Sequence, residues 1–176
     1  MKKVAATIAA ALYRLALVLF ARDFGIGTSS RPLGPLTVRI DAPRELVFDV
    51  IADPYLGRTP RALASKLKVV ERHEDSVLAE HYTPTGRIVT TTLETIHFER
   101  PDSVEFTLVR GPVPHVFERF ELRDADGGTE LGYSGELRTD LWALGRWWGR
   151  AVATRWVATV QGSLASITSE AERRAR

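Results

Sequence analysis

One change in the spacing of apolar residues constrains the fold of this chain more than any other feature. Between residues 67 and 138, apolar and polar side chains alternate, and short turns rich in Gly, Pro or Asp interrupt the alternation. A period of two is typical of half-buried strands joined by hairpins. After Asp140 the period lengthens, and apolar residues from Leu144 to Ile167 mark one face of a helix of about 30 residues. The sequence therefore predicts an antiparallel sheet followed by one long helix.

A strand and a helix precede this run. Residues 36–40 alternate, and Pro43 and Glu45 then indicate the first turn of a helix that we expect to stop at Asp53 and Pro54. The fold class is α+β, with a curved antiparallel sheet whose concave face the last helix covers, leaving room for a cavity. The expected strands are residues 36–40, 67–71, 77–82, 87–98, 104–108, 116–123 and 130–138.

Composition restricts the class of protein. The 176 residues fit one domain, and a hydrophobic fraction of 44% with a charged fraction of 26% is ordinary for a globular chain. The absence of cysteine excludes a disulfide scaffold, a thiolate metal site and a cysteine nucleophile.

Charge is unevenly distributed along the chain. The formal net charge is only +2, but residues 1–35 carry five basic and one acidic side chain, and residues 138–176 carry seven basic and three acidic ones. The middle of the chain, residues 36–137, has 12 basic and 18 acidic side chains. Two basic ends therefore flank an acidic sheet, which concerns surfaces and partners rather than the fold.

Residues 1–24 contain an apolar run from Val4 to Ala21 after two lysines. A secretory signal is disfavoured because Arg14 interrupts the run and no suitable cleavage site follows it, so we expect a cytoplasmic or membrane-associated protein. A spanning helix, a helix in the membrane interface and a helix packed on a protein surface remain open. We expect this apolar or amphipathic helix over residues 1–24 as a candidate membrane anchor, a linker over 25–35, and one domain over 36–176.

Several segments of the domain resemble one family. The strand, Asp-Ala-Pro and helix of residues 38–54 resemble the opening of START-like, or SRPBCC, proteins, which include polyketide cyclase-like and lipid-transfer members. The Arg-Gly-Pro of residues 110–112, the Glu-Arg-Phe of 118–120 and the Trp-rich last helix are compatible with it. The resemblance implies a helix-grip fold, in which a curved sheet of six to seven strands wraps around a long C-terminal helix and encloses an apolar ligand cavity. It implies no particular catalytic residue.

Motifs for common chemistries are missing. The sequence contains no GxGxxG, P-loop, GxSxG or HExxH pattern, and the pair His97 and Glu99 is typical of a strand surface. We therefore expect no cofactor, no metal site and no nucleic-acid partner, and we assign no catalytic residue.

Two kinds of polar residue are candidates for the interior. Glu118 shares a strand face with Val116 and Phe120, so it is expected to point into the cavity, where a buried carboxylate needs a partner or a raised pKa. Glu94 has a similar position on its strand. Arg155 in the last helix is a candidate partner across the cavity. Ligand recognition or acid–base chemistry is one interpretation, and a structural ion pair or an outward-facing charge is the other.

The expected function is binding or carrying an apolar small molecule of the lipid, isoprenoid or polyketide class. The alternatives are a cyclase or aromatase and a non-catalytic, membrane-associated protein that binds a partner. A second candidate partner is an anionic membrane surface, met through residues 1–24 and the basic last helix. The expected ligand-binding residues are Val89, Leu93, Phe106, Leu108, Glu118, Phe120, Trp148, Val152, Arg155 and Trp156.

Overall fold

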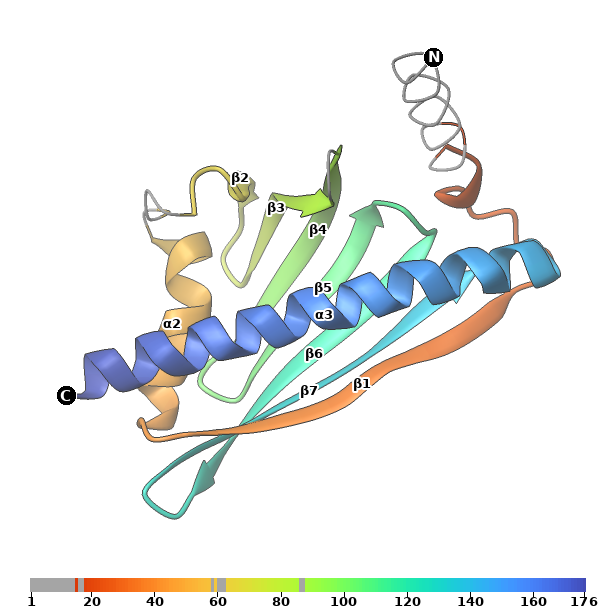
Figure 1. Ribbon diagram of the computed structural model, residues 1–176. Helices are drawn as coiled ribbons and strands as arrows, with labels where there is room; N and C mark the ends of the chain where they lie inside the picture. The colour runs from red at the N-terminus through yellow and green to blue at the C-terminus, as the bar shows by residue number, and fades with distance from the viewer. Residues whose placement is uncertain (1–14, 16–17, 58, 60–62, 86–87) are drawn as a thin grey trace, which may run out of the picture.

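The computed structural model describes residue 15 and residues 18–57, 59, 63–85 and 88–176 (Figure 1). These described residues form one antiparallel sheet of seven strands in the order β1-β7-β6-β5-β4-β3-β2. This arrangement confirms the α+β class and the helix-grip fold. The elements in chain order are β1 (Ser29–Ile40), α2 (Arg44–Leu56), β2 (Leu67–Arg72), β3 (Ser76–Thr85), β4 (Ile88–Glu99), β5 (Ser103–Arg110), β6 (His115–Ala125), β7 (Gly128–Thr139) and α3 (Trp142–Ala175).

The sheet curves around α3, which crosses its concave side, and α2 lies near the C-terminal end of α3 (Figure 1). The apolar face of α3 is buried through Trp148, Val152, Val160 and Leu164. An ion pair holds the C-terminal end of α3 against α2, because Arg174 contacts Asp53 of α2 at 2.7 Å. The concave face of the sheet is therefore enclosed by two helices and not by a second sheet.

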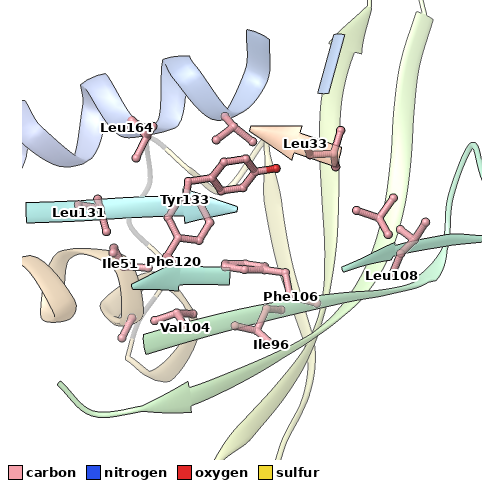
Figure 2. Packing of buried hydrophobic residues seen from close by; sticks show 14 of the residues in the cluster. Leu33, Ile51, Ile96, Val104, Phe106, Leu108, Phe120, Leu131, Tyr133 and Leu164 are labelled. Carbon is pink, nitrogen blue, oxygen red and sulfur yellow. The ribbon is translucent and has the colours of Figure 1, made fainter. Parts of the chain in front are cut away.

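Aromatic rings form the centre of the core between the sheet and the helices. The rings of Phe106 and Phe120 are 5.7 Å apart and those of Phe120 and Tyr133 are 5.2 Å apart, centroid to centroid. Figure 2 shows these three rings gathered between the strands, with Leu164 of α3 on the helix side. They come from adjacent strands, because alternation turns every second side chain inward.

The first strand begins earlier than the sequence predicted. Residues 29–35, which we expected to belong to a linker, form the first part of β1 and pair with β7 from Ser29 onward. The prediction was wrong because prolines such as Pro32 and Pro35, although typical of linkers, are also tolerated at the edge of a sheet. Since β1 is the edge strand, a proline there does not remove a required hydrogen bond.

The helix α2 also extends further than predicted. Pro54 lies inside it, and the helix ends at Leu56. The last turn is held by Tyr55, whose ring packs at 6.0 Å from the rings of both Phe98 and Phe106. Tertiary packing therefore overrides the proline signal near the end of the helix.

Most of the N-terminal segment lies outside the described residues, so the prediction for residues 1–24 stays a prediction. Leu15 and residues 18–20 are helical, and Phe20 stacks on Trp148 with ring centroids 5.1 Å apart. Among the described residues, no helix has both the length and the apolar character needed to cross a membrane.

Candidate functional site

Two carboxylates lie in the apolar interior of the sheet. Glu118 on β6 and Glu94 on β4 are 6% and 5% exposed. Alternation along β6 turns Glu118 to the same side as Val116 and Phe120, and its register partner on β5 is Phe106. An ionised carboxylate in such surroundings is costly unless hydrogen bonds or charges compensate for the lost water.

Glu118 is hydrogen-bonded to the next strand. The Tyr133 hydroxyl donates to Glu118 Oε1 at 2.6 Å. Gly135, the register partner of Glu118 on β7, leaves room for this contact, because a Cβ on Gly135 would lie 2.7 Å from the Phe117 carbonyl oxygen and 3.4 Å from Glu118 Cγ. The local sequence therefore places a small residue beside the buried acid and a phenol within its reach.

Burial raises the pKa of Glu118 from 4.5 to about 7, and the negative charge of Glu94 adds to the rise. Hydrogen bonding from Tyr133 and from the Trp156 indole, together with His81, acts in the opposite direction on this pKa. The carboxyl group of Glu118 therefore exchanges its proton near neutral pH.

A second set of polar side chains lies beside Glu94. His81 Nδ1 on β3 lies 3.0 Å from Glu94 Oε2, although the geometry is not that of a hydrogen bond. On the other side of the imidazole, His81 Nε2 and the Tyr55 hydroxyl are hydrogen-bonded at 2.9 Å. Burial, followed by the charges of Glu94 and Glu118, raises the pKa of Tyr55 above its usual value, so the phenol stays protonated.

The two polar groups share an aromatic neighbour. The ring of Phe106 is 6.3 Å from that of His81 and 5.7 Å from that of Phe120, which in turn neighbours Tyr133. The side chain of His81 is 20% exposed, so the set of polar side chains beside Glu94 also reaches the protein surface. The arrangement offers a carboxyl group that can give or take a proton, two neutral phenols and an imidazole beside apolar rings.

The structure brings seven of the predicted ligand residues to the inner side of the molecule. Six are buried and Trp156 is half-buried. Their position agrees with the prediction, whereas their role in binding stays a prediction. The seven residues are Phe106, Leu108, Glu118, Phe120, Trp148, Val152 and Trp156.

Three predicted residues point elsewhere. Val89 is 57% exposed, and Leu93 shares its outward strand face, opposite to that of Glu94. Arg155 is exposed, and its guanidinium bonds to the Ala151 carbonyl oxygen of its own helix at 3.4 Å. The expected ion pair of Glu118 with Arg155 is therefore wrong. The Glu118 carboxylate accepts a hydrogen bond from the Tyr133 hydroxyl instead.

Sequence reasoning missed three residues of the site. Tyr55 follows Phe48 and Ile51 at helical spacing, and His81 follows Val77 and Ala79 at strand spacing, so periodicity carried a signal for both. Tyr133 likewise lies two residues after Leu131 on an inward strand face.

A hollow of about 180 Å³ lies among residues of β1, β6 and β7 that include Thr37, Arg123, Tyr133 and Ser134. It does not include the buried carboxylates. Within the described part of the chain, no group of three or more His, Asp or Glu side chains is arranged to hold a metal ion.

A family model described as polyketide cyclase / dehydrase and lipid transport matches residues 36–172. The chain belongs to this family. No curated protein sequence matches the chain.

Solved structures share the fold of this family member. The Zhui aromatase/cyclase from Streptomyces is 17% identical, with a TM-score of 0.71 over 84% of this chain and 97% of that one. A protein of Thermus thermophilus is 15% identical, with a TM-score of 0.66 over 84% and 100% of the two chains. Norcoclaurine synthase from Thalictrum flavum, in complex with dopamine and hydroxybenzaldehyde, is 11% identical, with a TM-score of 0.67 over 88% and 94%. Identities this low establish the fold alone.

Proposed function

We propose that the protein binds an apolar small molecule that carries oxygen atoms, on the inner face of the sheet beneath α3. The observation that carries this proposal is the pair of buried carboxylates, Glu118 and Glu94, each contacting a Tyr or His side chain beside aromatic rings. Burial of apolar surface would supply the affinity, and the polar groups would orient the ligand. A pure hydrocarbon would leave these groups without a ligand partner, so a polyketide-like molecule suits them better than an isoprenoid hydrocarbon.

The comparisons support this class of ligand. The family description names polyketide cyclases and lipid transport. A protein of the same fold binds dopamine and hydroxybenzaldehyde, which are small aromatic molecules with hydroxyl or carbonyl groups. The candidate site of the present chain offers partners for the same groups in its Tyr, His and Glu side chains.

Binding of naphthol and of naphthalene tests the proposal, because the two probes differ only in one hydroxyl group. We expect the full-length protein to bind naphthol more tightly, and Glu118→Gln together with Glu94→Gln to reduce this preference by about tenfold, the value of a hydrogen bond to a charged group. Glu130→Gln, an exposed position on β7, is the control. Failure to take up either probe would refute the proposal.

A second candidate is acid–base catalysis of the cyclase type. It is favoured by the pKa of about 7 for Glu118, because a catalytic base works best when its pKa is near the operating pH. The ionised carboxylate would take a proton from a carbon beside a carbonyl group, and a neutral phenol such as Tyr55 would donate a hydrogen bond to the enolate oxygen that forms.

Exchange of the carbon-bound protons of acetylacetone in deuterated water, followed by NMR, tests this candidate. We expect the protein to accelerate the exchange with a rate that rises through pH 7 and is lost in Glu118→Gln. An exchange rate equal to that of buffer, in a preparation that does bind naphthol, would leave binding as the function and exclude this catalysis.

We also propose that the protein associates with an anionic membrane surface. The support comes from the basic residues at both ends of the chain and from the lipid transport named in the family description. Binding of the full chain to anionic vesicles is the direct measurement.

A further inference from the structure

Exposed apolar side chains gather where the N-terminal segment meets the start of α3. The two segments run side by side, because the Leu141 and Trp142 amides donate to the carbonyl oxygens of Ile26 and Gly27, each at 2.9 Å (Figure 1). Trp142 and Trp147 are 59% and 61% exposed, far above the usual value for an indole in a folded protein. The surface, called the aromatic end below, consists of Leu19, Phe24, Ile26, Trp142, Leu144 and Trp147.

Specific contacts build this surface. Asp140, which is 6% exposed, accepts hydrogen bonds from the Gly25 amide at 2.8 Å and the Thr28 hydroxyl at 3.0 Å, and also from the Phe24 amide. One buried carboxylate therefore fixes residues 24–28 against the beginning of α3. The backbone segments that carry the exposed side chains are held together by this anchor.

The backbone at Trp142 adopts an unusual conformation. Leu141 and Trp142 have φ angles of +71° and +48°, which residues other than Gly rarely adopt. The indole of Trp142 lies against Gly27, where a Cβ would be only 2.4 Å from Trp142 Cδ2. Such conformations persist where the surrounding contacts enforce them, and they gather at functional positions. Here they keep a large aromatic side chain on the surface.

Two arginines near the aromatic end form no ion pair within the described part of the chain. Arg146 and Arg150 lie one residue before and three residues after Trp147, and neither forms an ion pair with a described carboxylate. The other end of α3 differs, because Arg174 contacts both Glu170 and Asp53. Free basic charge and exposed indoles therefore coincide at the N-terminal end of the helix.

We propose that the aromatic end is the surface by which the protein docks on a bilayer containing anionic phospholipids. The inference rests on the proposed membrane association and names the residues that make the contact. Trp and Leu side chains would enter the interface, where indoles are enriched, and Arg146 and Arg150 would meet the phosphate groups. A second copy of the chain fits less well, since a symmetric contact would bring the same unpaired arginines together.

Vesicle binding by full-length protein tests the docking surface. Sedimentation with vesicles of phosphatidylcholine alone, and of phosphatidylcholine mixed with phosphatidylglycerol, measures partitioning. We expect the double substitution Arg146→Glu with Arg150→Glu to weaken binding to the mixed vesicles by roughly 30-fold, because each basic residue near the membrane contributes about fivefold to the affinity. Arg110→Glu with Arg123→Glu changes the net charge equally on exposed positions of the sheet, and we expect a far smaller effect.

Trp142→Ser with Trp147→Ser tests the apolar part of the surface, and we expect a loss of about tenfold or more in binding. The remaining Trp148 and Trp156 report by fluorescence that the variant is folded. No binding of the wild-type chain to mixed vesicles would refute the membrane association itself. If the wild-type protein binds and both double variants bind equally well, the aromatic end is refuted as the docking surface, while the membrane association itself stands. A concentration-dependent dimer that the tryptophan substitutions abolish would refute this surface in the same way.

Discussion

Replacement of Glu118 by Gln should make the free energy of unfolding less sensitive to a rise in pH from 4.5 to about 7. The pKa of this carboxyl group is raised from 4.5 to about 7 by burial and by the charge of Glu94. Below pH 4.5 it is protonated in both the folded and the unfolded chain and contributes nothing to pH dependence. Between pH 4.5 and 7 the unfolded chain loses this proton first, so the free energy of unfolding falls as pH rises. Above pH 7 the loss levels off.

The size of the effect follows from the two pKa values. A shift from 4.5 to about 7 corresponds to about 3 kcal/mol, at 1.36 kcal/mol per pH unit. Glutamine resembles the protonated acid and can still accept the hydrogen bond from Tyr133. The free energy of unfolding of Glu118→Gln relative to wild type should therefore rise by about 3 kcal/mol between pH 4 and pH 9.

Urea unfolding of both proteins across this range is the assay. The other titrating groups of the chain affect both proteins and largely cancel in the difference. With the usual dependence on urea, the difference in midpoint should change by about 1 M or more. Parallel curves for the two proteins at every pH would refute the assignment of Glu118 as a buried acid with a raised pKa.

Three further predictions follow from packing and hydrogen bonding. Gly135→Val should lower the free energy of unfolding by about 1–3 kcal/mol through a clash beside Glu118, whereas Gly132→Ala, with a nearest neighbour at 3.8 Å, should have little effect in the same thermal unfolding assay. Asp140→Ala should speed hydrogen exchange of the Gly25 amide by at least tenfold, and unchanged exchange would contradict its anchoring role. Arg155→Met should change stability by less than about 0.5 kcal/mol and leave naphthol binding intact, because this side chain is exposed.

Strand periodicity predicted the sheet well because one face of each strand is buried. On β6 the residues Val116, Glu118 and Phe120 have to share a face, so alternation places Glu118 on the same side as two large apolar residues. On β4 the same argument failed for Val89 and Leu93, since β-branched and apolar residues occur on both of its faces. Which face is concave depends on neighbouring strands, and that information is not local.

The partners of the acids were beyond the reach of local patterns. His81 and Glu94 meet because β3 and β4 pair in one particular register, and Tyr55 reaches them from a helix turn that follows a proline. Arg155 looked like a partner because of its position beside Trp156, but one helical residue corresponds to a rotation of about 100° and decides between interior and solvent. Contacts between elements therefore determined the site, whereas periodicity determined only the elements.

The two edges of the sheet have a consequence for association between chains. At β1, Pro32 and Pro35 lack amide protons and the pairing register shifts between Leu33 and Leu36. At the opposite edge, β2 has only six residues, carries charged side chains and also contains a register shift. Neither edge offers a second chain a long row of free backbone groups, which is how open sheets avoid growing into fibres. A sheet that stays open at both edges is in this way prevented from pairing with further chains.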